Sequence, residues 1–330
     1  CLSAGVTPVA MTRANADQRG LTGLDVERRT ADLLDKDAVH AAMAGVDVVL
    51  HVGAVHRNFT ADPKDMMGPA VDGTRHVLDG ALAHGIKRVV HVSTGATVGF
   101  SPDPARPLTE ETTLPAAHSA YVQAKLAAEK LALAAHKPGT LEVVVVNPSG
   151  VFGPLDYRLT PATRGLLGPL HGDPLFLHLC LTHVTDVARG IVLAAQKGVG
   201  GQRYLLAGAQ QSPKQLQALY IKLAGVKPAA FTPPRFLLNF LAGRMEKKAR
   251  ATGEDAGITK ASIDDVWGKH LAYDSTKART QLGATFLPAE ETLKDTLRWL
   301  LFVNAIKPGP AAKVRAALGG AAGPDPAWVM

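Results

Sequence analysis

Short apolar, β-branched runs alternate with amphipathic segments through the first half of this chain. The runs cover residues 7–11, 46–52, 88–92 and 141–146. Apolar residues recur at helical spacing in the segments between them, at 36–44, 71–83 and 121–135. Continuous apolar runs are typical of strands buried on both faces, as in parallel sheets. The alternation therefore predicts an α/β fold built on a doubly wound parallel sheet.

The second half of the chain is less regular. Beyond Gly153, loops rich in Pro and Gly separate a helical segment at 184–196, a strand at 203–206 and further helices that reach Trp299. Because a strand and a helix recur between residues 175 and 206, we expect this segment to contribute some elements to the parallel sheet of the first half.

These patterns predict three unequal parts. We expect a first domain over residues 1–153 and a second, smaller part over residues 154–306. Residues 307–330 are rich in Ala, Gly and Pro and have no sustained apolar face. Such a composition cannot bury enough apolar surface to offset chain entropy, so it predicts a disordered tail.

Charge narrows the choice of partners. A formal net charge of +7 suggests an anionic ligand, but outside residues 244–250 the basic residues are scattered. Aromatic residues make up only 5% of the chain, which is poor material for stacking bases. We therefore expect a small-molecule partner and no nucleic acid.

The chain has two cysteines, Cys1 and Cys180, far apart in sequence. Such sparse cysteine usage favours a reducing compartment, and it predicts a cytoplasmic protein. No apolar run approaches the roughly 18 residues that a membrane helix needs, so no membrane span is expected.

Tyr121 and Lys125 stand four residues apart at the start of a predicted helix, so they share one face. A phenol that exchanges protons near neutral pH must have its pKa lowered by about three, which corresponds to about 4 kcal/mol. An ammonium about 4 Å away supplies a comparable energy at an effective dielectric constant of about 20. The pair is energetically sufficient for acid/base chemistry.

Two strand ends surround this pair in the sequence. The strand at 88–92 runs into Ser93-Thr94, and the strand at 141–146 runs into residues 147–154, which contain Pro and Gly. In open α/β sheets, ligands bind at the carboxyl ends of the strands. The hydroxyls of Ser93 and Thr94 are therefore expected to meet the Tyr121 phenol at one edge of the sheet.

At this point the sequence resembles the extended short-chain dehydrogenase/reductases, especially the branch related to dihydroflavonol reductases, 3β-hydroxysteroid dehydrogenases and sugar-nucleotide epimerases. The resemblance extends over most of residues 1–300. It is carried by residues 31–35, 51–54, 72–74, 93–94, 121–125, 147–154 and 183–190. It implies a Rossmann-type sheet, with residues 1–153 binding a dinucleotide and residues 154–306 mainly binding the substrate.

The resemblance also implies catalytic roles. Tyr121 corresponds to the acid/base, and Lys125 to the residue that holds the nicotinamide ribose and tunes the phenol. Thr94 corresponds to the hydroxyl that positions the reacting oxygen, with Ser93 as the alternative. No metal is expected, because an alternating strand and a helix entry explain the spacing of His178, Cys180 and His183.

Further positions match residues that flank the cofactor in the family. Besides Tyr121 and Lys125, they are Asp32, Leu33, Val52, Gly53, Ala54, Pro148 and Val151. For Val52, Ala54 and Val151, a purely structural packing role is as well supported as direct contact with the cofactor. Arg13 follows the first predicted strand, where an arginine suits the 2′-phosphate of NADP. We therefore expect NADP(H), with NAD as the alternative.

Two features depart from the family pattern. The glycine-rich turn between a first strand and a first helix is absent, and residues 1–5 resemble the end of that helix. We therefore expect an N-terminally truncated sequence whose sheet lacks its first strand and glycine-rich loop. In addition, Ala70 stands where many relatives carry Asn before the Gly-Thr pair.

Two local patterns have competing interpretations. Thr185-Asp186 precedes an apolar helix and is interpreted as a helix cap. Residues 236–250 combine apolar side chains with a basic cluster; we favour a substrate-domain helix with a solvated basic end over a helix on an acidic membrane surface.

The sequence thus predicts an NADP(H)-dependent oxidoreductase that acts on a ketone, aldehyde or secondary alcohol, with Tyr121 as acid/base. The first alternative is an NAD-dependent nucleotide-sugar epimerase or dehydratase with the same site, for which Arg158, Arg164 and Arg203 are candidate phosphate ligands. The second is a non-catalytic, cofactor-sensing protein. The resemblance implies a homodimer paired through residues 71–83 and 121–135.

Overall fold

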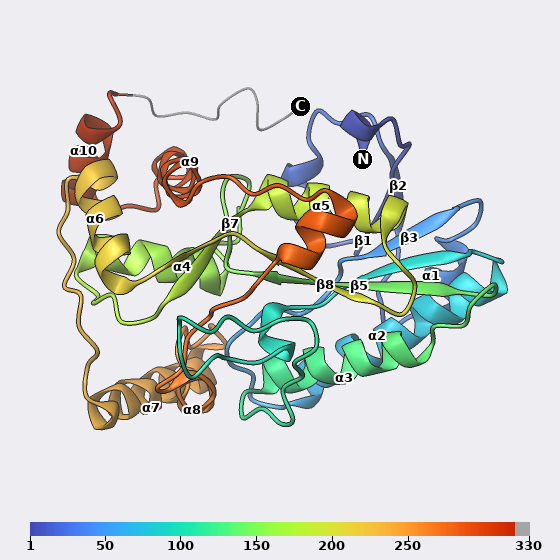
Figure 1. Cartoon of the computed structure of the whole chain (residues 1–330), viewed down its shortest axis with the longest axis horizontal. Helices are drawn as coiled ribbons and strands as arrows, with labels where there is room; N and C mark the ends of the chain where they lie inside the picture. Colours follow the sequence, from blue (N-terminus) through green and yellow to red (C-terminus); the bar gives the residue numbers. More distant parts are fainter. Residues whose placement is uncertain (321–330) are drawn as a thin grey trace.

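The computed structural model describes residues 1–320 and contains a parallel sheet in two pieces (Figure 1). The larger piece has the order β3-β4-β5-β8, and all of its pairs are parallel. Its strands are β3 (Val48–His51), β4 (Arg88–Val92), β5 (Glu142–Ser149) and β8 (Arg203–Ala207). The smaller piece pairs β1 (Val9–Thr12) with β2 (Glu27–Thr30), also in parallel.

Helices cover both faces of the larger sheet. On one face lie α1 (Lys36–Ala41), α2 (Lys64–Ala83) and α3 (Ala120–Ala134), and on the other lies α5 (Val184–Lys197) (Figure 1). Successive strand residues face opposite sides, so Val89 packs toward α2 while Val90 packs toward α5. The predicted doubly wound α/β fold is therefore confirmed.

The two pieces of sheet are not hydrogen-bonded to each other. The family resemblance places one further strand between β1 and β3, and residues 1–320 contribute none there. Side chains connect the pieces instead: Leu33, just after β2, lies so close to Gly53 that a β-carbon there would be 3.1 Å from its Cδ1. The segments that follow β2 and β3 therefore meet at the carboxyl edge of the two pieces of sheet.

The second half builds its own core. A small sheet joins β6 (Val151–Phe152), β7 (Leu179–His183) and β9 (Ala209–Gln211). Around it pack α4 (Pro161–Leu167), α6 (Pro213–Ala224) and α9 (Ala289–Phe302), while α7 (Arg235–Thr252) and α8 (Lys260–Val266) pack on each other. Strand β8 belongs to the larger sheet, so the second half of the chain also contributes a strand to the sheet of the first half.

Element bounds differ from the prediction where apolar periodicity is weak. Strand β2 was missed because its sequence, Glu-Arg-Arg-Thr, is polar and mostly exposed. Helix α2 begins at Lys64, seven residues before the predicted start, although Pro69 lies inside it. Across residues 1–320, no helix combines the length and apolar composition that a bilayer span requires.

The predicted cap of α5 is wrong. His183 is the N-cap, and its Nδ1 accepts a hydrogen bond from the Thr185 backbone N–H at 3.2 Å. Asp186 is buried instead, and its carboxylate accepts from the Leu287 backbone N–H at 2.7 Å. The Asp186 carboxylate, which local spacing assigned to the helix cap, thus accepts instead from Leu287, a residue distant in sequence.

The predicted disordered tail is wrong for residues 308–317, which form α10 (Pro308–Ala317). Ala311 and Val314 are buried and join the core that includes α6 and α9. Two apolar residues are too few to produce a recognisable periodic face, so only the tertiary contact reveals the helix. The last ten residues of the predicted tail lie outside the described residues.

Val314→Ala should lower the free energy of unfolding by about 1–3 kcal/mol, because it removes methyl groups from a filled core. The measurement is urea denaturation followed by circular dichroism. Val199→Ala is the matched control, since Val199 is 56% exposed and should change stability by less than about 0.5 kcal/mol. Equal losses in both variants would contradict the packing of α10.

Candidate active site

Tyr121 and Lys125 lie on the first turns of α3, against the end of β4. The Lys125 ammonium donates a hydrogen bond of 2.7 Å to the carbonyl oxygen of Val92, the last residue of β4. The half-buried Tyr121 ring lies beside His56, with ring centroids 5.0 Å apart. The pair therefore faces the carboxyl edge of the sheet, as the spacing predicts.

Thr94 lies two residues after the end of β4, and its hydroxyl is close enough to the Tyr121 phenol to lower that phenol's pKa. Its backbone carbonyl accepts from the Thr97 hydroxyl at 2.7 Å and from the Asn147 amide at 3.1 Å. These two bonds hold the Thr94 backbone in place while its half-buried side chain faces the phenol. The structure thus brings Thr94, Tyr121 and Lys125 together.

Ser93, the alternative to Thr94, is engaged elsewhere. Its buried hydroxyl donates to the carboxylate of Glu129, which projects from α3. A hydroxyl that already donates to a buried carboxylate is a poor ligand for a substrate oxygen. The geometry therefore favours Thr94.

The ionisation of the pair differs from the expectation. Burial raises the pKa of Tyr121 to about 12, and the hydrogen bond from Thr94 opposes the rise. Burial also lowers the pKa of Lys125 to about 8, opposed by the negative charge of Glu129. The Lys125 ammonium is directed at the Val92 carbonyl, and with a pKa of about 12 the Tyr121 phenol is protonated at neutral pH.

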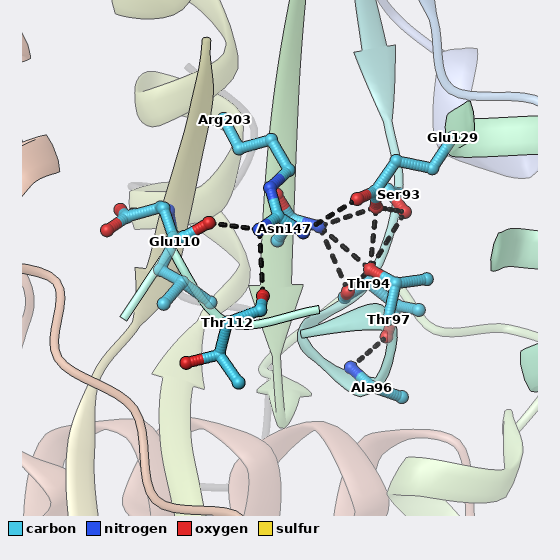
Figure 2. A network of polar contacts seen from close by, with 10 residues as sticks. Ser93, Thr94, Ala96, Thr97, Glu110, Thr112, Glu129, Asn147 and Arg203 are labelled. Atoms are coloured by element: carbon cyan, nitrogen blue, oxygen red, sulfur yellow. Dashed lines mark hydrogen bonds and ion pairs between the residues drawn. The ribbon is translucent and has the colours of Figure 1, made fainter. Parts of the chain in front are cut away.

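A buried polar network under the site centres on Glu129 (Figure 2). One of its carboxylate oxygens accepts from the Asn147 amide at 2.8 Å and from Ser93, and it lies 2.6 Å from the Thr97 hydroxyl oxygen. The other forms an ion pair with Arg203 at 3.0 Å. Glu129 was not predicted, although its position four residues after Lys125 places it on the same helix face.

Arg203 extends this network from β8. Its guanidinium also donates to the backbone carbonyls of Glu110 and Thr112, the latter at 2.7 Å (Figure 2). Only 9% of the residue is exposed. Arg203 was a candidate ligand for a nucleotide sugar. Because its guanidinium is bound to Glu129, Glu110 and Thr112, it is no longer a candidate for that role.

Two aspartates from the second half hold the loops beside Tyr121. Asp265 of α8, which is buried, accepts from the backbone N–H groups of His118 and Ser119 at 2.7 and 3.0 Å. These groups lie at the N-terminus of α3, where helix N–H groups have no partner within the helix. Asp255 accepts in the same way from Asn58 and Phe59. Nothing in the local sequence distinguishes these aspartates from surface residues.

The predicted cofactor residues lie at strand ends. Arg13 and Asp32 are exposed just after β1 and β2, and residues 52–54 are exposed just after β3. Leu33 contacts Gly53, so those two predicted positions are brought together. Asp32 also accepts from the Leu34 backbone N–H at 2.9 Å, which shapes its own turn.

Two of the predicted positions serve packing. Pro148 lies within β5, buried opposite Leu206 of β8. Val151 is half-buried and packs against the cluster on the α5 face of the sheet. Their backbone still belongs to the strand-end segment that follows β5, but their side chains face neighbouring residues.

These residues fit the two ends of a dinucleotide better than they fit its middle. An exposed guanidinium at Arg13 and an exposed carboxylate at Asp32 suit an adenosine end, and Tyr121 and Lys125 suit a nicotinamide end. Within residues 1–320, no glycine-rich turn joins a strand of the sheet to a following helix, so the described residues supply no cradle for a pyrophosphate.

Comparisons with known proteins agree with this arrangement. The model of the NAD dependent epimerase/dehydratase family matches residues 1–207. A Synechocystis protein described as a dihydroflavonol 4-reductase is 29% identical over 306 residues, covering 90% of this chain and 88% of its own. Sterol demethylase protein B of Methylococcus capsulatus is 31% identical over 242 residues, covering 72% and 73%.

The crystal structure of gox2253 superposes with a TM-score of 0.78 at 29% identity, covering 93% of this chain and 94% of that one. The fold and site thus define an NAD(P)-dependent enzyme of the extended short-chain dehydrogenase/reductase type. The chain belongs to the NAD-dependent epimerase/dehydratase family.

Glu129→Gln should destabilise the fold by about 3–5 kcal/mol, because it leaves the buried Arg203 guanidinium without its countercharge. Glu142→Gln is the matched control, since the Glu142 side chain, paired with Arg88, is 41% exposed and should cost at most about 1 kcal/mol. Denaturant unfolding compares the two. Similar costs would show that the Glu129 pair does not support the fold.

Proposed function

We propose that this chain is an NADP(H)-dependent oxidoreductase that interconverts a ketone or aldehyde and the corresponding alcohol. The observation that carries the proposal is the proximity of the Thr94 hydroxyl to the Tyr121 phenol, with Lys125 one turn further along the same helix, at the carboxyl edge of the sheet. A substrate oxygen placed between the two hydroxyls can receive a hydrogen bond from each.

In the direction of reduction, Thr94 orients the substrate carbonyl and Tyr121 donates its proton to the oxygen. The bound cofactor supplies the hydride that adds to the carbonyl carbon. Lys125 has three N–H donors and uses one on the Val92 carbonyl, so the remaining donors are available for a ribose hydroxyl. Lys125 itself is buried, so water competes little for its donors.

The pKa of Tyr121 favours this direction. A phenol with a pKa of about 12 is protonated at neutral pH and can act as an acid at once. Oxidation of an alcohol requires the phenolate, whose population rises with pH. Unless ligand binding lowers this pKa, alcohol oxidation gains rate as pH increases while carbonyl reduction does not.

Arg13 supports the choice of NADP(H). Its exposed guanidinium follows β1 directly, where it can pair with a 2′-phosphate through charge-assisted hydrogen bonds. Asp32, Leu33 and residues 52–54 would flank the adenosine at the neighbouring strand ends. NAD remains the alternative, in which the ribose 2′-hydroxyl is free.

Epimerisation of a nucleotide sugar would use the same three residues and return the hydride to the same molecule. Of its candidate phosphate ligands, Arg158 and Arg164 are exposed while Arg203 is engaged under the sheet. A cofactor-sensing protein would need the pocket but not the proton donor. The three functions therefore differ in whether the cofactor undergoes net oxidation, and the test measures that difference.

Because residues 1–320 supply no cradle for a pyrophosphate, the test uses the protein with the family's first strand and glycine-rich loop placed before residue 1. It is incubated with NADPH and with panels of ketones, aldehydes and nucleotide sugars. Net oxidation of NADPH with a carbonyl substrate supports the proposal. Epimerised sugar without net oxidation would instead support the epimerase, and binding without turnover the sensor.

Tyr121→Phe should then lower kcat by about 10²–10⁴-fold, because the proton donor is lost. Tyr220→Phe is the matched control, since it removes a phenol that donates to the Leu166 carbonyl in the second core. Steady-state kinetics compare the variants. Unchanged turnover in Tyr121→Phe would contradict the mechanism.

Arg13→Glu should raise the KM for NADPH by about 10–100-fold, as expected for the loss of one charge-assisted hydrogen bond, and should leave the KM for NADH nearly unchanged. Arg315→Glu, an equal charge change on the exposed side of α10, is the control. If both cofactors weaken equally, Arg13 does not read the 2′-phosphate.

A further inference from the structure

The outward face of α7 carries large apolar side chains that nothing covers among the described residues. Phe236 is 76% exposed and Phe240 60%, and Leu241 and Leu237 are 45% and 41% exposed. The sequence favours a substrate-domain helix with a solvated basic end over a helix on an acidic membrane surface, and the exposed apolar side chains support the second interpretation instead. An exposed apolar cluster of this kind marks an interaction surface.

This apolar cluster is separate from the seam that holds α7 to the protein. The buried residues of α7 are Leu238, Ala242 and Ala249, and Leu238 and Ala242 pack with Ile263 of α8. At about 100° per residue, the four exposed apolar residues occupy an arc of about 140° on the other side of the helix. In Figure 1, α7 lies at the lower-left margin of the molecule beside α8.

Cations share this arc. Arg244 and Lys247 are exposed and fall between the apolar residues in the helical projection. Neither forms an ion pair with another residue in 1–320, and the Arg244 guanidinium lies 6.0 Å from the centre of the Phe240 ring. Over its length, α7 has five basic residues and one acidic residue, so the apolar face carries a net positive charge.

We propose that this face of α7 docks on an anionic lipid surface. Phenylalanine and leucine side chains enter the boundary between headgroups and acyl chains, while neighbouring lysine and arginine side chains bind the anionic headgroups. The mixture of unpaired cations with projecting aromatic rings on one convex helix matches that chemistry. A protein partner would instead require complementary pockets for the rings.

The last turn of α7, beyond the docking face, contacts the loop that borders the candidate active site. The Arg250 guanidinium lies 5.2 Å above the Phe59 ring, and Asp255 binds the backbone of Asn58 and Phe59. This loop also carries His56, whose ring lies beside Tyr121. The inference rests on α7 alone and does not depend on the proposed function.

The experiment measures co-sedimentation of the full chain with two kinds of vesicle, phosphatidylcholine alone and phosphatidylcholine mixed with phosphatidylglycerol. We expect binding to the anionic vesicles that weakens as salt is raised. Phe236→Ser combined with Phe240→Ser should reduce binding at least about tenfold. Arg244→Glu and Lys247→Glu should each reduce it at least about fivefold.

Ile221→Ser is the matched control, because Ile221 is 47% exposed on α6, and it should leave binding unchanged. Circular dichroism checks that every variant is folded. If the wild-type protein stays in solution with both vesicles, or if the α7 variants bind as well as it does, the proposal is wrong. The proposal is equally wrong if the variant with both phenylalanines replaced differs from the wild-type protein only in its oligomeric state without lipid, and not in vesicle binding.

Discussion

The carboxylate of Glu129 is the interaction on which the site depends. It is buried beneath the sheet edge and joins α3 to β4 through Ser93, to β5 through Asn147 and to β8 through Arg203. A buried charge with several hydrogen-bond partners and a countercharge tolerates little displacement, because any lost partner leaves a desolvated group. The helix that carries Tyr121 is thereby held in one position relative to three strands.

The same helix is held at two other points. Lys125 bonds to the end of β4, and Asp265 binds the N–H groups at the helix N-terminus. Since Asp265 belongs to the second half of the chain, the position of Tyr121 depends on both halves. The site is a joint product of the sheet and of the α7–α8 segment, which also carries the outward face that we propose to bind lipid.

Short-range patterns identified residues of the candidate site that the structure places at one edge of the sheet. Tyr121 and Lys125 share a helix face by spacing alone, and the strand end at Thr94 follows from the apolar run before it. Spacing did not distinguish Thr94 from Ser93, because the choice depends on Glu129, which is distant in sequence. The direction of the Tyr121 pKa shift was also missed, since burial raises this pKa by more than the neighbouring Thr94 hydroxyl lowers it.

The sequence by itself determined the alternating α/β architecture and the placement of Tyr121 and Lys125 on one helix face, because both arise from local periodicity. Tertiary structure decided which polar groups are free and which are engaged: Arg203 and Asp186 are buried with distant partners, whereas Phe236 and Phe240 project outward. Burial and hydrogen-bond pairing depend on segments far apart in the chain, and local sequence patterns do not contain that information. For the same reason α10 became recognisable only once α6 provided a surface for Val314.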